Sequence, residues 1–316
     1  MATGFPMADP MDSSLNDLVR GLKAGRLDWH CRAAAPAPVP RCEQLPLSAA
    51  VHDTVHNLIR ALFPLHMGPG DLQRGEEDTF VAGTLSKALV QLSEQVLREL
   101  RYHRRSEGVA APEEALRARA EGIVSAFCGL LPAISRTLGT DIVAAYKGDP
   151  AAISVDEALL CYPGVQAIIH HRLAHALHGL GLPLIARIIS ERSHTMTGID
   201  IHPGAVIGQS FFIDHGTGVV IGESAVIGNR VRLYHAVTLG AKRFPTDEHG
   251  QLTKGEARHP IVEDDVVVYA GATILGRVTV GKGAIIGGNV WLTHDVAPGG
   301  TVTQANVNRP EVADRP

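Results

Sequence analysis

The sequence has few cysteines and no concentration of positive charge, and both absences narrow the range of functions. No C-x-x-C pair occurs in the 316 residues, and the cysteines are Cys31, Cys42, Cys128 and Cys161. A disulfide framework and a structural zinc site are therefore not expected, and the pattern fits a reducing compartment. With 29 Lys and Arg against 33 Asp and Glu, the net charge is −4, so no polybasic surface for nucleic acid or anionic membrane is expected.

Signals for export and membrane insertion are also missing. The first residues lack the basic-then-apolar order of a signal peptide. No apolar run approaches the roughly 18 residues of a membrane span. We therefore expect a cytoplasmic protein that acts on small molecules, and the 45% of hydrophobic residues suffice for a sizeable core.

The first 196 residues divide into two segments. Residues 1–45 are rich in Ala, Pro, Asp and Ser, and "CRAAAPAPVPRC" predicts a flexible leader. From residue 46 to residue 196, apolar residues recur at three- and four-residue spacing, as in "AAVHDTVHNLIRALF" and "GVQAIIHHRLAHALHGLG". This spacing predicts an all-helical N-terminal domain.

At about Gly198 the period changes from that of a helix to a strict repeat of six residues. Many of the repeating aliphatic residues are followed by Gly. The thirteen positions, in two registers, are Ile201, Ile207, Ile213, Ile221, Ile227, Leu233, Leu239, Val262, Val268, Ile274, Val280, Ile286 and Leu292. Such a pattern is typical of a parallel β-helix with three short strands per coil, in which the aliphatic residues point inward and small residues turn the corners. The sequence therefore predicts an α+β protein with a β-helix over residues 197–302 and a tail over residues 303–316.

The rhythm is interrupted twice. The step from Ile213 to Ile221 is eight residues, so "DHGTG" carries two extra residues, and the step from Leu239 to Val262 is 23 residues. The second interruption predicts an extruded loop over residues 241–258. Loops on a rigid solenoid are common places for binding sites.

The motifs around these interruptions resemble the serine O-acetyltransferase family of hexapeptide-repeat acyltransferases. The resemblance runs from about Asp141 to Gly300 and is carried by "KGDPAA", "GIDIHPGAVIG", "FIDHGTGVVIGE", "VTLGA", "RHPIVEDDVVVYAGATILG" and "VGKGAIIGGNV". It implies a left-handed β-helix and acetyl transfer from acetyl-CoA to L-serine, the first step of cysteine biosynthesis from serine. The long loop resembles that of a subgroup with an enlarged loop.

The chemistry needs a base that removes the proton of the serine hydroxyl as its oxygen attacks a thioester. A histidine suits this task near neutral pH, and His215, within the eight-residue step, is the candidate. A carboxylate on the other ring nitrogen would orient the base, as in hydrolase triads. By resemblance that partner is Asp200.

Serine carries an ammonium and a carboxylate group, so its site needs at least one acid and one cation. By resemblance, Asp149 and Asp214 meet the amino and hydroxyl side of serine, and Arg258 and His259 bind its carboxylate. The planar fork of an arginine suits a bidentate carboxylate partner.

The resemblance also implies where acetyl-CoA lies and how the chains assemble. Acetyl-CoA is expected as a co-substrate in a groove between β-helices, beside Gly240, Ala270 and Gly288, with no metal. A homotrimer with each active site between two subunits is implied, with a dimer of trimers as an alternative. The tail lacks the C-terminal Ile by which some members dock into O-acetylserine sulfhydrylase, so that complex is not expected.

Histidines leave a metal alternative open. His171, His175 and His178 share one helical face at a spacing that suits zinc, but no carboxylate lies among them and packing is the stronger explanation. A γ-class carbonic anhydrase would need three His ligands on neighbouring coils. The available residues would be His202, His215 and His235, without the paired spacing of that class.

Two further alternatives concern function. The acceptor could be another small amino acid or an amino sugar, although the pairing of Asp149 with Arg258 favours an amino acid. A non-catalytic β-helix scaffold is the other, and five polar groups at two interruptions of the repeat argue against it.

Overall fold

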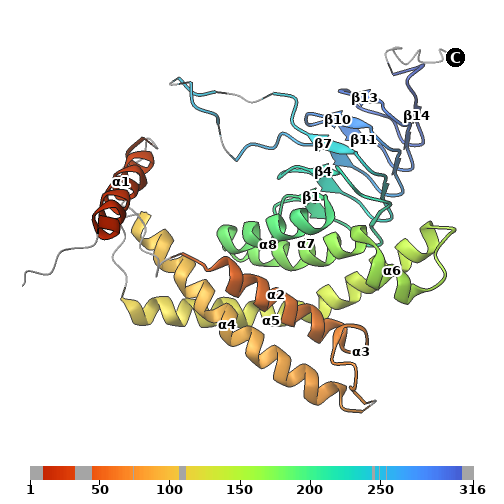
Figure 1. Ribbon diagram of the computed structural model, residues 1–316. Coiled ribbons are helices and arrows are strands. Elements are labelled where there is room, and N and C mark those ends of the chain that lie inside the picture. Colours follow the sequence, from red (N-terminus) through yellow and green to blue (C-terminus); the bar gives the residue numbers. More distant parts are fainter. Residues whose placement is uncertain are drawn as a thin grey trace, which may run out of the picture.

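The computed structural model describes residues 10–32, 45–73, 75–106, 112–243, 246–248, 250–253 and 255–307. A helical layer is followed along the chain by a stack of short parallel strands (Figure 1). The helices are α1 (Pro10–Arg32), α2 (Ser48–Leu62), α3 (Pro64–Met67), α4 (Glu77–Ser106), α5 (Glu113–Gly148), α6 (Val155–Cys161), α7 (Pro163–Gly179) and α8 (Pro183–Thr197). The change from helix to strand falls between Thr197 and Asp200, and α8 ends at Gly198, whose φ of 69° suits glycine.

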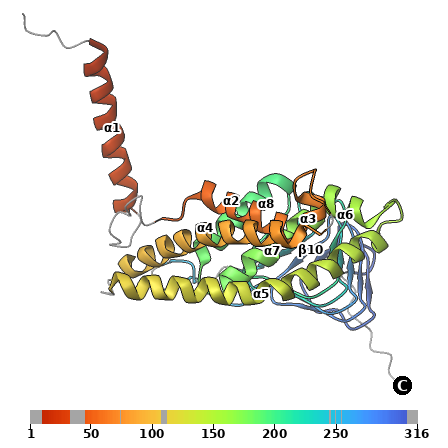
Figure 2. The same ribbon diagram turned by 90° about the horizontal axis from the view of Figure 1, so that it is seen from below.

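Helix α1 is a finding that the composition of the first 45 residues did not predict. Figure 2 shows it projecting away from the packed helices. Residues 1–9 and 33–44, which include "AAAPAPVP", lie outside the described residues, as do residues 308–316 of the tail. The helix adds no residue to the candidate site described below.

Helix starts carry the expected chemistry. Proline occupies the first turn of α7 and of α8, and the Ser154 hydroxyl accepts a hydrogen bond from the Glu157 amide at the start of α6. The buried Glu99 of α4 accepts hydrogen bonds from the amides of Leu184 and Ile185, at 2.8 and 2.9 Å. A carboxylate from one helix thus satisfies free amides in the first turn of another, which fixes α4 against α8.

Helix α5 corrects one expectation. Glu113–Gly148 contains an 18-residue window that is long and apolar enough to cross a membrane by length and composition, and 17% of that window is buried within the chain. The helix packs against α4, α7 and β3, and its last turn reaches the β-helix. Leu130 and Val143 are among its exposed apolar residues.

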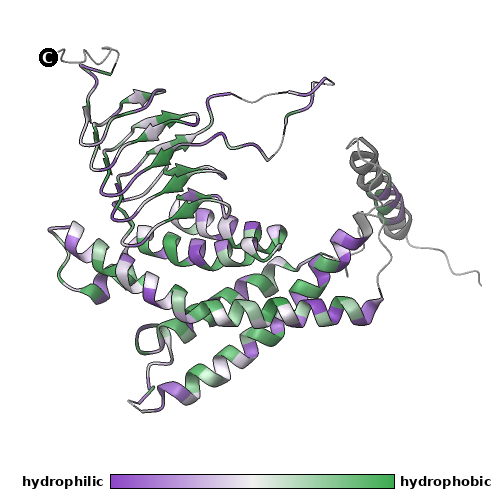
Figure 3. Ribbon diagram, turned by 180° about the vertical axis from the view of Figure 1, so that it is seen from behind, coloured by the Kyte–Doolittle hydropathy of each residue, from purple (hydrophilic) through white to green (hydrophobic). Residues whose placement is uncertain are grey.

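The strands form a parallel β-helix with three faces, here called sheets A, B and C. Sheet A has the order β1-β4-β7-β10-β13, sheet B has β11-β8-β5-β2, and sheet C has β14-β12-β9-β6-β3. The strands are β1 (Asp200–Ile201), β2 (Val206–Ile207), β3 (Phe212–Ile213), β4 (Val220–Ile221), β5 (Val226–Ile227), β6 (Arg232–Leu233), β7 (Thr238–Gly240), β8 (Ile261–Val262), β9 (Val267–Val268), β10 (Thr273–Leu275), β11 (Thr279–Val280), β12 (Ile285–Ile286), β13 (Trp291–Leu292) and β14 (Thr301–Val302). Figure 3 shows hydrophobic residues along the strands of successive coils.

All thirteen residues of the six-residue repeat lie inside this prism, and none is more than 7% exposed. Their burial is the main source of stability for the coils, since a strand of two residues has few hydrogen bonds of its own. The predicted fold class, an all-helical region followed by a hexapeptide-repeat β-helix, is confirmed.

The corners differ from the expectation in one respect. Left-handed φ values fall mainly three residues after an aliphatic position, for example at Ser210, Arg230 and Asn289, with φ of 56° or 57°. The glycines directly after the aliphatic residues serve a different purpose. A methyl group at Gly208 would lie 2.6 Å from the backbone of Gly228 on the next coil, so glycine there permits close stacking of the turns.

Candidate active site

The chain passes from sheet A to B to C and back to A, so each coil has three corners, named here by the sheets that they join. The A–B corner comprises residues 202–205, 222–225, 241–260 and 276–278, and the B–C corner includes residues 208–211 and 228–231. The C–A corner comprises residues 214–219, 234–237, 269–272 and 287–290. The two interruptions lie at opposite ends of the strands of sheet A. The eight-residue step precedes β4, and the long loop follows β7.

His215 lies at the C–A corner in the eight-residue step. It has a φ of 58°, in the left-handed region that several other corner residues of the prism also adopt. Its side chain is 72% exposed, and its Nδ1 is 3.8 Å from Oδ1 of Asp214. The His235 ring, one coil further on, meets it edge to face at 5.6 Å between centroids. The imidazole is therefore open to a substrate.

Asp214 precedes this histidine and is buried. Its Oδ2 accepts a hydrogen bond of 2.6 Å from Nη2 of Arg232. The register pairs β3 with β6, so Asp214, which follows β3, and Arg232, which begins β6, lie on neighbouring coils. A buried carboxylate needs such a partner to remain ionised.

Asp149 reaches the same corner from the helical layer, directly after α5. The Tyr162 hydroxyl donates to its Oδ2 at 2.5 Å, and the Ala151 amide donates to its Oδ1 at 2.8 Å. These two hydrogen bonds, the hydroxyl first, lower the pKa of Asp149 below its ordinary value, and Arg232 and His215 act in the same direction. The same contact raises the pKa of Tyr162 to about 12.

Asp200 opens β1, and its Cα is paired in register with that of Val220. The next turn packs closely here, since a methyl group at Gly216 would overlap the Ile199 side chain. Among the described residues, however, no hydrogen bond joins Asp200 to His215, and Asp214 is the carboxylate that pairs with the ring. The orienting role expected of Asp200 stays a prediction.

Arg258 and His259 lie at the A–B corner, where the long loop returns to the prism. Nη2 of Arg258 donates to Oε2 of Glu223 at 2.8 Å, and Nη1 donates to the Glu256 carbonyl at 3.2 Å. The guanidinium is thus held in one orientation. A second cation, Arg277, lies at the same corner and donates to the Ser224 and His259 carbonyls at 2.7 and 3.0 Å.

The turn at residues 222–224 holds His259. The Ser224 hydroxyl lies 2.9 Å from Nδ1 of His259, to which the Ser224 amide also donates at 3.1 Å, and the hydroxyl accepts from the Arg258 and His259 amides. The ring lies directly over Gly222, where a methyl group would overlap it. Burial, then Arg258, lowers the pKa of His259. An acceptor Nδ1 leaves Nε2 as the N–H donor.

The residues expected to contact acetyl-CoA divide between the two corners. Ala270 and Gly288 stack on neighbouring coils at the C–A corner, where the Asn289 amide donates to the Ala270 carbonyl at 2.9 Å. Gly240 ends β7 at the A–B corner, beside the start of the long loop. Small side chains at all three positions leave the backbone open to a ligand.

The structure thus brings together three of the six predicted catalytic and serine-binding residues, namely Asp149, Asp214 and His215. Arg258 and His259 lie together at the other end of sheet A, within one chain. Sequence reasoning did not identify Tyr162, Arg232, Glu223 and Ser224. The eight-residue step lengthens this coil to 20 residues, so Arg232 is in register with Phe212 and lies beside Asp214 two residues further along.

The histidines of α7 are placed mainly by packing. His171 is buried and stacks on His175, with 5.6 Å between the ring centroids. Burial lowers the pKa of His171 well below the ordinary value. His178 meets His202 at the A–B corner. Of the three histidines considered for carbonic anhydrase chemistry, His215 and His235 share the C–A corner, whereas His202 lies at the A–B corner.

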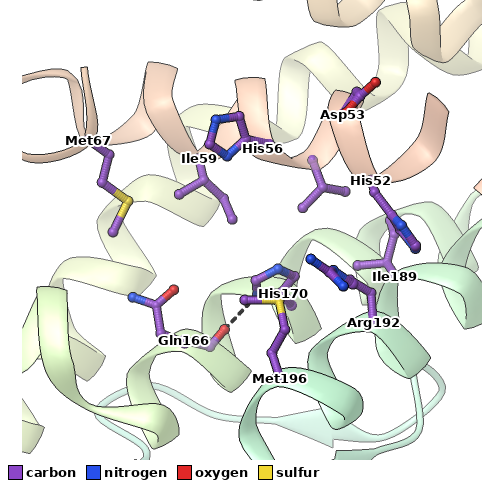
Figure 4. A pocket seen from close by; sticks show the side chains of 11 residues that line it. His52, Asp53, His56, Ile59, Met67, Gln166, His170, Ile189, Arg192 and Met196 are labelled. Carbon is purple, nitrogen blue, oxygen red and sulfur yellow. Dashed lines mark hydrogen bonds between the residues drawn. The ribbon is translucent and has the colours of Figure 1, made fainter. Parts of the chain in front are cut away.

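A pocket lies in the helical layer, away from these corners (Figure 4). Helices α2, α7 and α8 supply most of its wall. Its polar lining residues are His52, Asp53, His56, Gln166, His170 and Arg192. In Figure 4, His170 is held by a hydrogen bond from its Nδ1 to the Gln166 carbonyl, at 2.7 Å.

Comparison with known proteins identifies the family of the chain. The model of the family described as bacterial transferase hexapeptide (six repeats) matches residues 259–294. A plasmid-encoded serine acetyltransferase of Synechococcus elongatus is 55% identical over 271 residues, which cover 85% of this chain and 83% of that protein. A serine acetyltransferase of Mycobacterium tuberculosis is 48% identical over 51% of this chain and 67% of its own length.

Solved structures are similar over most of the chain. Serine acetyltransferase 1 of Entamoeba histolytica in complex with L-cysteine has a TM-score of 0.67 and 34% identity, and covers 81% of this chain and 97% of that chain. The serine acetyltransferase of Neisseria gonorrhoeae in complex with serine has a TM-score of 0.51 and 28% identity, over 80% of this chain and 94% of that one. The order of helical layer and β-helix, the two specialised corners and the identity over most of both chains lead to one conclusion: this chain belongs to the serine acetyltransferase family.

Proposed function

We propose that this enzyme transfers the acetyl group of acetyl-CoA to the hydroxyl of L-serine, with His215 as general base, in sites that two copies of the chain form together. The observation that carries the proposal is the cluster at the C–A corner. An exposed histidine stands there beside two carboxylates, one from the β-helix and one from the residue that follows α5.

In the proposed reaction, an imidazole nitrogen of His215 takes the hydroxyl proton of serine as the oxygen attacks the carbonyl carbon of the thioester. The new C–O bond forms and the C–S bond breaks. The proton then passes from the imidazolium to the sulfur, which leaves as the thiol of CoA. The nearby Asp214 carboxylate stabilises the imidazolium, and the products are O-acetylserine and CoA.

Asp149 and Asp214 supply the negative charge that the ammonium of serine requires. Arg258, with His259 as a second N–H donor, suits the carboxylate of serine. Because these pairs occupy opposite ends of sheet A, a single chain does not offer both halves to one serine molecule.

A second copy resolves this separation. Three prisms arranged with sheet A toward a common axis bring the C–A corner of each copy against the A–B corner of the next. Sheet A carries outward apolar residues suited to such contacts, including Val220 and Trp291, which are 38% and 63% exposed. The contact between two neighbouring prisms is here called the seam. It would hold acetyl-CoA between Ala270 and Gly288 of one copy and Gly240 of its neighbour.

The test is release of the CoA thiol from acetyl-CoA with L-serine. Replacing the base in His215→Ala should lower serine-dependent release by at least ~100-fold, while His194→Ala, at an exposed position of α8, should keep it. Absence of serine-dependent release by the wild type would overturn the proposed reaction. Near-normal release by His215→Ala would remove this residue as the base.

The acceptor can be tested in the same assay. An ammonium–carboxylate pair suits L-serine, while an amino sugar lacks the carboxylate that Arg258 would bind. Faster release with an amino sugar than with L-serine would therefore assign a different acceptor. A non-catalytic scaffold would release no CoA with any acceptor.

A further inference from the structure

Arg232 occupies an unusual place for an outward residue of a solenoid strand. Its guanidinium carbon lies 4.6 Å from the ring centre of Tyr234 and 5.1 Å from that of Phe212. Contacts of a cation with two aromatic rings hold the guanidinium where it is. The side chain is 26% exposed.

The same aromatic packing connects this arginine to α5. A methyl group at Gly148 would lie 2.7 Å from the Phe212 ring, so the last residue of α5 rests directly on that ring. Asp149 follows immediately. The arginine, the phenylalanine and the end of the helix therefore form one packed unit beneath the candidate site.

The hydrogen bonds of Arg232 are few and directed. Nη2 donates to Oδ2 of Asp214 at 2.6 Å, whereas the buried Nε has no hydrogen-bond partner among the described residues. An unpaired buried donor destabilises the folded state. The orientation of the side chain thus provides a hydrogen bond to Asp214 but leaves its own Nε without one among the described residues.

Charge around His215 comes from several elements. Asp214 precedes it in the turn, Asp149 faces it from the end of α5, Arg232 faces both acids from β6, and His235 lies on the next coil, while the Tyr162 and Tyr234 hydroxyls interact with the same two acids. Within this group the arginine is the one permanent cation. It leaves two carboxylates with one net negative charge, which matches the single ammonium of an amino-acid acceptor.

We propose that Arg232 is a positioning residue of the acceptor site: it holds Asp214 through Oδ2, leaves Oδ1 turned toward His215, and neutralises one of the two carboxylates around the base. This inference rests on the proposed function, because it takes His215 as the base. Without the arginine, Asp214 is a buried carboxylate whose remaining neighbour is the imidazole at 3.8 Å. The carboxylate then stabilises the imidazolium more strongly, so a higher pH is needed to free the base.

The test compares pH profiles of kcat/KM for serine in the wild type, Arg232→Met, Arg232→Lys and Arg230→Met. Arg230 is a matched control, since it lies two residues away on the same coil and pairs with Asp265 at the B–C corner. In Arg232→Met the acid limb should move to higher pH by about one unit, which is about a tenfold loss of kcat/KM at a pH on that limb. Arg232→Lys should keep most of the wild-type limb, and Arg230→Met should not move it.

A purely structural role predicts a different pattern. Arg232→Met would then melt at a lower temperature but keep the wild-type acid limb, and that result overturns the inference. If Arg232→Met does not fold, Arg232→Gln takes its place. In either background a second substitution, Asp214→Asn, should return the limb toward lower pH, and failure to do so also counts against the inference.

The NMR titration of the His215 imidazole provides a readout that does not depend on activity. Its midpoint should move to higher pH in Arg232→Met and stay in place in Arg230→Met. Full activity of His215→Ala would remove His215 as the base of the proposed function, and the titration would still test the electrostatic effect of Arg232. If His215→Ala is inactive but the midpoint does not move in Arg232→Met, the inference about Arg232 is overturned and the proposed function stands.

Discussion

Asp141 of α5 and Arg172 of α7 form a two-pronged ion pair at the junction of the helical layer and the β-helix. Nε and Nη2 of the arginine lie 2.7 and 3.0 Å from the two carboxylate oxygens. The arginine also donates to the Ile207 and Gly208 carbonyls, and the carboxylate accepts from the Phe211 amide at 2.9 Å. The pair therefore fixes the first coil, and with it the C–A corner, against the end of α5.

Removing one member of this pair should destabilise the fold. In Arg172→Met the buried Asp141 loses its counter-ion, which is expected to cost about 3–5 kcal/mol of unfolding free energy. Denaturant unfolding measures this. Arg187→Met, which breaks an exposed pair with Glu191, is the control and should cost less than about 1 kcal/mol. Equal stability of the two variants would contradict the role of the junction.

Subunit mixing tests whether two copies share each site. His215→Ala and Arg258→Ala should each be nearly inactive alone. In trimers assembled from equal amounts of both, about a quarter of the seams combine an intact His215 with an intact Arg258, so about a quarter of wild-type activity should return. Inactive mixed trimers, shown to be mixed by mass spectrometry, would place both residues in the site of a single chain.

Ser224 should matter for serine binding through His259. Its hydroxyl holds Nδ1 of His259 and accepts from two backbone amides of the returning loop. Ser224→Ala should raise KM for serine by about tenfold, the effect of losing one hydrogen bond to a binding group, with kcat much less changed. Ser224→Thr keeps the hydroxyl and should behave like the wild type. A fall in kcat with unchanged KM would instead place His259 in the chemical step.

Stability should fall in mild acid because buried histidines must take up protons. Burial lowers the pKa of His202 to about 4 and that of His171 well below 6.5. Between pH 6.5 and about 4 the unfolded chain therefore binds more protons than the folded chain, and stability decreases as pH falls through this window. Thermal melting measured from pH 7 to pH 5 should show this decrease.

His171→Leu isolates one of these groups. Nδ1 of His171 is buried without a hydrogen-bond partner among the described residues, so an apolar side chain loses no bond at that atom. The variant should lose fewer degrees of Tm between pH 7 and pH 5 than the wild type. His194→Leu, at an exposed position of α8, serves as control. The same loss in wild type and His171→Leu would assign the acid sensitivity to other groups.

The repeat was readable from the sequence because its physical cause is local. Each coil buries its own aliphatic residues, so a position such as Ile274 carries the same signal in isolation as in the stack. The interruptions were readable for the same reason, since His215 lies where the six-residue step fails. Helix α1 was not predicted, because the Ala- and Pro-rich composition next to it obscured its pattern.

Contacts between elements distant in the chain required the tertiary structure. Nothing in the spacing of Tyr162 or Ser224 indicates their hydrogen bonds to Asp149 and His259, because those bonds depend on how helices and loops return to the prism. The expected bond between Asp200 and His215 depends on rotamers, which the sequence does not specify. The partner of Asp214 is an arginine from the next coil.

The sequence by itself determined the class of fold, the family resemblance and the chemical types at the candidate site, because periodic burial and short motifs are properties of neighbouring residues. The tertiary structure decided how those residues are grouped. It set Asp149, Asp214 and His215 at one end of sheet A and Arg258 and His259 at the other. The physical reason is the triangular path of the coil, which sends residues about twenty positions apart to the same corner and residues eight positions apart to different ones.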